Sequence, residues 1–183
     1  MHYSVVKFFV STVDLVDIQN KRILEVGSYN VNGSLRDIIV PTMYPKEYIG
    51  IDITSGNYVD QLISASTIDQ VFGAESFDVV ICTEMLEHAE DWKSAINNMK
   101  AVLKCNGLLF LTTRSKGFPL HCFPDDYWRF EIYDMKKIFM DMDSHILLDN
   151  QDPGVFVYAK KLNNTSMIDL SNINVYSMKL ENQ

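Results

Sequence analysis

The sequence has fewer basic residues than acidic ones. It contains 16 Lys and Arg against 24 Asp and Glu, a formal net charge of −8, and the basic residues form no run. Clustered basic side chains that neutralise phosphates supply most of the affinity of nucleic-acid-binding proteins, so this deficit argues against DNA or RNA as a partner. It equally argues against adhesion to an anionic membrane surface.

Long apolar runs and paired cysteines are also lacking. No apolar segment reaches the roughly 18 residues that a membrane-spanning helix requires, and the first residues lack the basic and then apolar pattern of a signal peptide. The three cysteines, Cys82, Cys105 and Cys122, form no close pair, which argues against a disulfide framework or a zinc site. We therefore expect a cytoplasmic protein without a membrane anchor or a bound metal.

The composition is that of an ordinary globular domain. Apolar residues make up 47% of the 183 residues and charged residues 22%, which suits a single hydrophobic core. No internal repeat or linker divides the chain, so we predict one domain over residues 1–162. The polar remainder, residues 163–183, is expected to add a strand over 173–178 or to be partly disordered.

Short apolar segments alternate with segments of helical spacing. The predicted strands are 22–27, 48–53, 59–63, 77–82, 108–113, 145–148 and 155–158. The predicted helices are 3–18, 35–40 with Pro41 ending it, 68–72, 92–103 with a stop at 105–107, and 133–141. This alternation predicts an α/β fold with a mostly parallel seven-stranded sheet and helices on both faces. The last two strands are too close for a parallel crossover, so the last strand is expected to be antiparallel.

A glycine turn follows the first predicted strand, where parallel sheets place their ligands. Gly27 allows the backbone to approach a ligand closely, and the helix predicted after Ser34 offers free N–H groups to a carboxylate or phosphate. A tight turn into a capped helix, with no ligand, has the same pattern.

Asp52 ends the second predicted strand, where an acid can accept hydrogen bonds from ribose hydroxyls. A solvated loop aspartate or a helix cap is the alternative. A dinucleotide is disfavoured because Gly27 and Gly33 do not match G-x-G-x-x-G and residues 29–31 would obstruct a pyrophosphate. Glu25, by contrast, suits the ammonium group of an amino-acid-like ligand.

Four segments together carry a resemblance to a known family. They are Ile23-Leu24-Glu25-Val26-Gly27-Ser28, Ile49-Gly50-Ile51-Asp52, the block from Ser76 to His88, and the approach to the fifth strand from Leu103 to Leu108. In these segments the chain resembles the class I S-adenosylmethionine-dependent methyltransferases, over about residues 20–160. The resemblance implies a Rossmann-like fold and S-adenosylmethionine as the cofactor.

The resemblance also implies which residues hold the cofactor. They lie at the ends of successive strands: Glu25, Gly27, Ser28 and Gly33 beside the methionine part, Asp52, Ile53 and Ser64 around the ribose and adenine, and Thr83, Glu84 and Leu86 near the sulfonium. Ser64 stands where the family often has an aspartate.

The aromatic-rich stretch 114–130 follows the fifth strand and is expected to face a small-molecule acceptor. Tyr127, Trp128 and Arg129 are predicted to contact that acceptor, and His121 is predicted as a general base. The alternative is a lid whose aromatic rings fill the core, with Arg129 paired to an acid.

Two neighbouring features of this stretch have structural interpretations. His88 is expected to cap or pack at the start of a helix, and Asp125 or Asp126 can be an N-cap.

The sequence thus predicts methyl transfer from S-adenosylmethionine to a small molecule, on oxygen or nitrogen. A non-catalytic, methyltransferase-like binding or regulatory protein is the first alternative. A nicotinamide-dependent oxidoreductase is the second.

Overall fold

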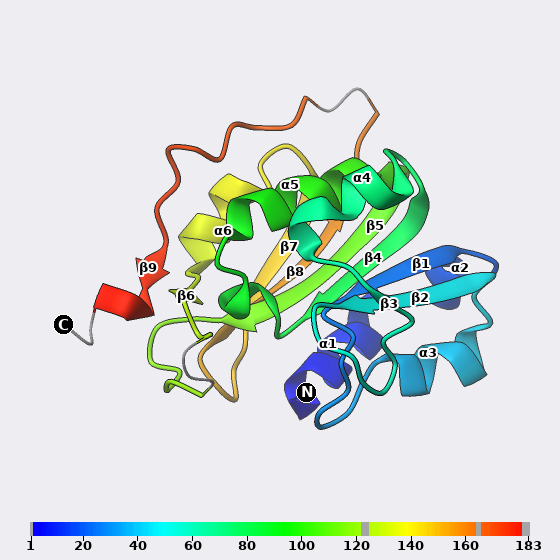
Figure 1. Ribbon diagram of the computed structural model, residues 1–183, viewed down its shortest axis with the longest axis horizontal. Helices are drawn as coiled ribbons and strands as arrows, with labels where there is room; N and C mark the ends of the chain where they lie inside the picture. The colour runs from blue at the N-terminus through cyan, green and yellow to red at the C-terminus, as the bar shows by residue number, and fades with distance from the viewer. Residues whose placement is uncertain (1, 122–124, 164–165, 181–183) are drawn as a thin grey trace.

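The sheet of this protein has the predicted α/β topology. The computed structural model describes residues 2–121, 125–163 and 166–180, and Cys122 lies outside them. In the described residues seven strands form one sheet in the order β3-β2-β1-β4-β5-β8-β7 (Figure 1). Their bounds are β1 Arg22–Val26, β2 Glu47–Asp52, β3 Gln61–Leu62, β4 Phe77–Thr83, β5 Leu103–Arg114, β7 Asp143–Leu148 and β8 Gly154–Lys160.

Strands β1 to β5 are parallel to one another, whereas β8 runs antiparallel between β5 and β7. The predicted fold class and the antiparallel last strand of the sheet are therefore confirmed. Because β1 pairs with both β2 and β4, the carboxyl ends of these three strands lie together at one edge of the sheet.

Helices cover both faces of the sheet, as predicted. Helices α1 (Tyr3–Thr12), α2 (Leu15–Ile18) and α3 (Arg36–Met43) share one apolar cluster with one face of the sheet. Helices α4 (Ile68–Phe72), α5 (Trp92–Val102) and α6 (Ile132–Ile138) share the other (Figure 1).

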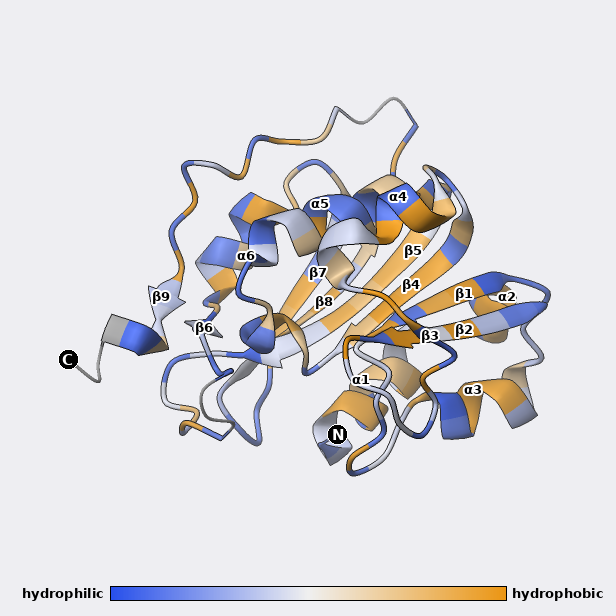
Figure 2. Ribbon diagram, in the orientation of Figure 1, coloured by the Kyte–Doolittle hydropathy of each residue, from blue (hydrophilic) through white to orange (hydrophobic). Residues whose placement is uncertain are grey.

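The buried strands are apolar on both faces, as a covered parallel sheet requires. In β4, Val79 and Ile81 point into the cluster with α1 to α3, and Val80 and Cys82 into the cluster with α4 to α6. Figure 2 shows the resulting hydrophobic colour along β1, β4 and β5. A one-residue shift of β4 would exchange these two sets of side chains between the two clusters.

Three element boundaries were predicted wrongly. The first helix is divided at Val13 and Asp14, because the Asp14 N–H turns to bond the Asp17 carboxylate at 3.0 Å and starts α2. Pro41 lies inside α3 and does not end it. Helix α5 ends at Val102, before the predicted stop, and residues 105–107 belong to β5.

The C-terminal segment returns to the loop that follows β5. Strand β9 (Tyr176–Ser177), inside the predicted 173–178, pairs antiparallel with β6 (Trp128–Arg129). The Met178 N–H donates to the Tyr127 carbonyl at 2.8 Å, and Leu170 is buried in the core. The segment thus braces the loop from outside (Figure 1).

None of the helices in the described ranges is long and apolar enough to cross a bilayer.

A buried ion pair joins α5 to the segment after α6. The Lys100 ammonium donates to the Asp141 carboxylate and to the Ile138 carbonyl, both at 2.6 Å, and each charged side chain is 3% exposed. Burial lowers the pKa of Lys100, and the Asp141 carboxylate opposes that shift.

We expect Lys100→Ala to lower the free energy of unfolding by about 3–5 kcal/mol, because it leaves the Asp141 carboxylate buried without its partner. Urea unfolding followed by circular dichroism measures this loss. Lys104→Ala is the matched control, since Lys104 pairs with Asp78 but is 41% exposed, and it should cost less than about 1 kcal/mol. Equal losses in the two variants would contradict the interpretation.

Candidate active site

The turn after β1 is built around Gly27, which has a left-handed φ of +80°. A Cβ atom at Gly27 would lie 2.4 Å from the Met85 Cγ, so the turn is in direct contact with the segment that follows β4. The amides of Gly27 and Ser28 both donate to the Ile51 carbonyl, at 2.9 and 3.0 Å. These contacts bring the ends of β1, β2 and β4 to one place.

Two polar side chains of this turn are buried with unused hydrogen-bonding atoms. Glu25 is 2% exposed and accepts from the Ser34 hydroxyl through Oε1 at 3.2 Å. Among the described residues, neither Glu25 Oε2 nor Ser28 Oγ has a hydrogen-bond partner. Burial raises the pKa of Glu25 from 4.5 to about 7, although the nearby hydroxyls of Tyr48 and Ser34 oppose the shift. Because buried polar groups are normally satisfied, these atoms suit a polar ligand.

Asp52 follows β2 and faces the same turn. Its carboxylate accepts from the Tyr29 N–H at 3.2 Å and from the Thr54 N–H at 2.9 Å. A carboxylate has about four lone-pair sites, so the two backbone bonds orient the group and leave capacity for two hydroxyl donors. Ile53 beside it is 77% exposed and presents an apolar surface at the sheet edge.

Ser64 and Gly33 have local structural contacts. The Ser64 hydroxyl accepts from the Ser66 N–H at 3.3 Å and caps the 3₁₀ segment Ala65–Thr67. The Gly33 N–H, at a φ of 113°, donates to the Asn30 side chain at 2.8 Å.

Glu84 connects the ends of β4 and β5. It has a φ of +54°, and its carboxylate accepts from the Thr112 hydroxyl at 2.8 Å and forms an ion pair with the fully buried Arg114. Thr83 is half-buried at the strand end, while Leu86 is completely buried in the core. The Glu84 carboxylate is therefore held by protein partners at the edge where Gly27 meets Met85.

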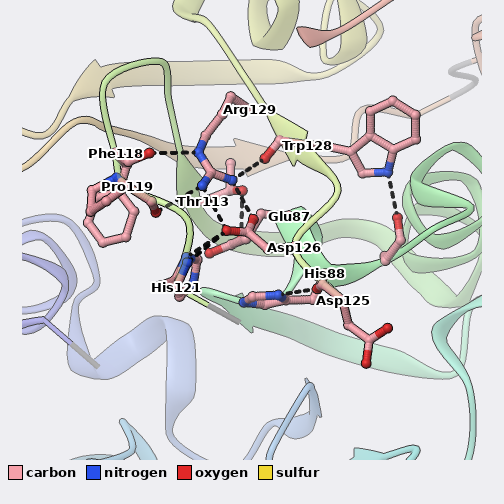
Figure 3. A network of polar contacts seen from close by, with 11 residues as sticks. Glu87, His88, Thr113, Phe118, Pro119, His121, Asp125, Asp126, Trp128 and Arg129 are labelled. Atoms are coloured by element: carbon pink, nitrogen blue, oxygen red, sulfur yellow. Dashed lines mark hydrogen bonds and ion pairs between the residues drawn. The ribbon is translucent and has the colours of Figure 1, made fainter. Parts of the chain in front are cut away.

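The loop after β5 is organised by a buried ion pair between Asp126 and Arg129. The Arg129 guanidinium binds both Asp126 oxygens and also donates to the carbonyls of Phe118 and Pro119, at 3.2 and 3.0 Å (Figure 3). Arg129 is 0% exposed, so its donors shape the loop from within.

His121 is oriented by this same carboxylate. Its Nδ1 lies 3.0 Å from Asp126 Oδ2, and its backbone N–H donates to the same oxygen at 3.1 Å. Burial lowers the pKa of His121; Asp126 opposes the shift and His88 adds to it. Burial acts to raise the pKa of Asp126, but hydrogen bonds from Arg129 and the His121 amide lower it overall. The result is a neutral imidazole beside an ionised carboxylate.

Tyr127 and Trp128 are bonded to the segment after β4. The Tyr127 N–H donates to the Glu87 carbonyl at 2.9 Å, and the Trp128 indole N–H donates to the Ala89 carbonyl at 3.0 Å. These bonds place the loop after β5 directly against residues 87–90. A surface hollow of about 630 Å³ opens along the loop, lined by residues 116–120, Arg129, Tyr176 and Met178.

The structure therefore brings together Glu25, Gly27, Ser28, Asp52 and Thr83 at one sheet edge, with His121 on the adjoining loop. The sequence did not reveal the role of Arg114, whose guanidinium pairs with Glu84 and lies 3.6 Å from the Asp149 carboxylate. It also gave no role to Glu87, a buried acid beside His88, and its place four residues after the end of β4 was the available signal.

Comparison with known proteins agrees with this geometry. A family model described as a methyltransferase domain matches residues 6–151. The ubiquinone biosynthesis O-methyltransferase of Histophilus somni is 51% identical over 45 residues, 25% of this chain but only 19% of that relative's length. This matched segment thus spans about a fifth of that relative.

Solved structures share the fold. The YcgJ protein of Bacillus subtilis has a TM-score of 0.63 at 14% identity, covering 90% of this chain and 100% of that one. The 1,6-didemethyltoxoflavin-N1-methyltransferase of Burkholderia thailandensis, with bound 1,6-didemethyltoxoflavin and S-adenosylhomocysteine, has a TM-score of 0.61 at 10% identity, covering 87% and 77%. The family match supports the predicted enzyme class and the predicted cofactor, S-adenosylmethionine. Since the family model covers most of the sequence, this chain belongs to the methyltransferase domain family, which confirms the resemblance that its motifs carry to the class I S-adenosylmethionine-dependent methyltransferases.

Proposed function

We propose that this chain transfers the methyl group of S-adenosylmethionine to an oxygen or nitrogen of a small-molecule acceptor. The observation that carries the proposal is the meeting of the Gly27 turn, Asp52 and Met85 at one sheet edge. When bound, the cofactor supplies a methyl group on a positively charged sulfur. The names of the relatives, O-methyltransferases of a quinone pathway, support a small organic acceptor with a reactive oxygen.

The residues at the edge fit the cofactor. The unpartnered Glu25 Oε2 suits its ammonium group, the glycine turn suits its amino-acid backbone, and the Asp52 carboxylate suits the two ribose hydroxyls. Met85 touches this turn, and Glu87 and Ala89 just after it accept hydrogen bonds from the loop after β5. The chain's contribution to catalysis is to hold the acceptor atom in line with the methyl carbon and the sulfur.

The bond changes balance without any further reactant. The acceptor atom forms a bond to the methyl carbon while the carbon–sulfur bond breaks and its electron pair stays on sulfur. The acceptor would give its proton to water, and S-adenosylhomocysteine would be the second product.

A non-catalytic binding protein is the second candidate, and two observations favour it. Tyr29 lies in the turn after β1 with its ring against Gly56, and the Ser64 hydroxyl is already bonded to the Ser66 N–H. Calorimetry with S-adenosylmethionine separates the candidates, because absence of binding at millimolar cofactor would favour the second. Transfer of a labelled methyl group to any member of a panel of phenols, catechols and amines would exclude it.

Replacing Asp52 tests the nucleoside half of the site. We expect Asp52→Ala to weaken S-adenosylmethionine binding by about 1.5–3 kcal/mol, the range for hydrogen bonds to a charged group. Isothermal calorimetry measures the effect, and Asp143→Ala, an exposed acid on β7 at the opposite edge of the sheet, is the control. A folded Asp52→Ala variant with the parental dissociation constant would remove Asp52 from the site.

The buried Glu25 gives a pH prediction. Its pKa is raised from 4.5 to about 7 by burial, so the folded state favours the protonated carboxyl. The stabilisation that Glu25 contributes is fully present below its pKa in the unfolded chain. It is lost as the pH rises through its pKa in the folded chain.

Compared with Glu25→Gln, the native chain should therefore lose about 3 kcal/mol of unfolding free energy as the pH rises from roughly 4.5 to 7. Urea unfolding at a series of pH values measures the difference. Saturating S-adenosylmethionine should reduce the loss, because an ammonium partner favours the ionised carboxylate. Parallel pH profiles for the two proteins would show that Glu25 does not titrate in this range.

A further inference from the structure

Three side chains that sequence analysis did not combine converge on one point. Glu87 and His88 belong to the 3₁₀ segment Leu86–His88 directly after β4, and His121 lies in the loop after β5. One potential ligand atom from each residue lies within 4.8 Å of the other two. Figure 3 shows the two imidazoles beside Glu87, next to the Asp126–Arg129 pair.

The other polar atom of each side chain is already engaged by the protein. His88 Nδ1 lies 2.5 Å from the Asp125 carbonyl, which can only accept, so this nitrogen carries the proton. His121 Nδ1 lies 3.0 Å from the Asp126 carboxylate and likewise donates. Both imidazoles therefore keep the lone pair on Nε2. In a metal-binding histidine, the ring nitrogen that does not bind the metal usually donates to a carbonyl or a carboxylate.

Glu87 supplies an independent observation. It is 0% exposed, and its Oε2 accepts from the Thr113 hydroxyl at 2.8 Å. Within the described residues its Oε1 has no hydrogen-bond partner. A buried carboxylate oxygen without a partner is costly, and a bound cation or hydrogen-bond donor would remove that cost.

We propose that Glu87, His88 and His121 bind one divalent transition-metal ion through Glu87 Oε1 and the Nε2 atoms of the two histidines. Two imidazoles and a carboxylate suit zinc and its first-row neighbours better than magnesium or calcium. Metal–ligand bonds of about 2.0–2.2 Å require the ligand atoms to approach one another by roughly 1 Å. Residues 119–121 are exposed and can supply that movement. This proposal differs from the expectation from sequence that the protein binds no metal.

Three protein ligands leave an open position on such an ion. Glu87 and His88 follow Met85, which touches Gly27, so the three ligands lie beside the proposed methyl-transfer site. This step rests on the proposed function. The ion lowers the pKa of an acceptor hydroxyl, so the oxygen attacks the methyl carbon after releasing its proton to water. The acceptor is then an alcohol or phenol, and His121 is a metal ligand, not the general base predicted from sequence.

Metal binding is tested without any acceptor. Calorimetric titration of the chelator-treated full chain with Co²⁺ should show one equivalent bound. His121→Ala and Glu87→Gln should each weaken that binding at least about tenfold, since even an outer contact of a metal ligand is worth 10- to 100-fold. His145→Ala is the matched control, because His145 is an exposed histidine on β7, and it should bind as the native chain does.

Folding is monitored by circular dichroism. Glu87→Gln keeps an oxygen for the Thr113 hydroxyl, and His121 is exposed, so at least the second variant should fold. Absence of Co²⁺ binding, or binding that survives both substitutions, would overturn the metal site. S-adenosylmethionine binding, measured in EDTA, separates the metal site from the proposed function. If the chain binds the cofactor but not Co²⁺, only the metal site is refuted. If it binds Co²⁺ but not the cofactor, only the proposed function is refuted.

Once an acceptor is found, turnover distinguishes the two roles of His121. EDTA should abolish methyl transfer by the native chain, and added Co²⁺ or Zn²⁺ should restore it. A general base predicts instead that EDTA has no effect while His121→Ala lowers the rate by about 10²–10⁴-fold. That second pattern would overturn the metal's part in the reaction.

Discussion

The parallel pairing of β1 with both β2 and β4 is the constraint on which the site depends. It places Gly27, Asp52 and Thr83 at the same edge although 56 positions separate the first from the last. The two-sided apolar burial of these strands fixes their register, so a shift by one residue would turn every one of these side chains to the wrong face. The chemistry of the edge therefore follows from the packing of the core.

Buried charges then shape what lies beyond the strands. Arg114 ties Glu84 to the end of β5, and Arg129 ties Asp126 to the carbonyls of the following loop. A buried ion pair is a costly way to gain stability, and replacing one by apolar residues is often neutral. Its value here is geometric, because planar guanidinium forks hold carboxylates in fixed orientations. Asp126 can orient His121 only because Arg129 fixes it first.

The two halves of the site are built differently. The half proposed to bind the cofactor consists of backbone turns and strand ends, with Glu25 as a buried carboxyl group. The half proposed to face the acceptor is the loop after β5, which packs on residues 87–90 and pairs with β9 on its outer side. Loops on a rigid scaffold vary more readily than the strands that carry them. The split explains why the family and its cofactor are evident in this chain while the acceptor remains a proposal.

The sequence by itself determined the sheet, its antiparallel last strand, the helices on both faces and the residues at each strand end. Those features depend on local periodicity and on short segments such as residues 77–88, which a single sequence displays. Helix ends such as Pro41 and Asp14 were less predictable, because tertiary burial and side-chain caps outweigh local propensity there. Only the tertiary structure brought His121 to Glu87 and His88, whereas the pairing of Arg129 with an acid was one of the two interpretations that the sequence left open. The contact between His121 and His88, which lies 33 residues earlier, depends on the packing of both segments, and no local pattern in the chain encodes it.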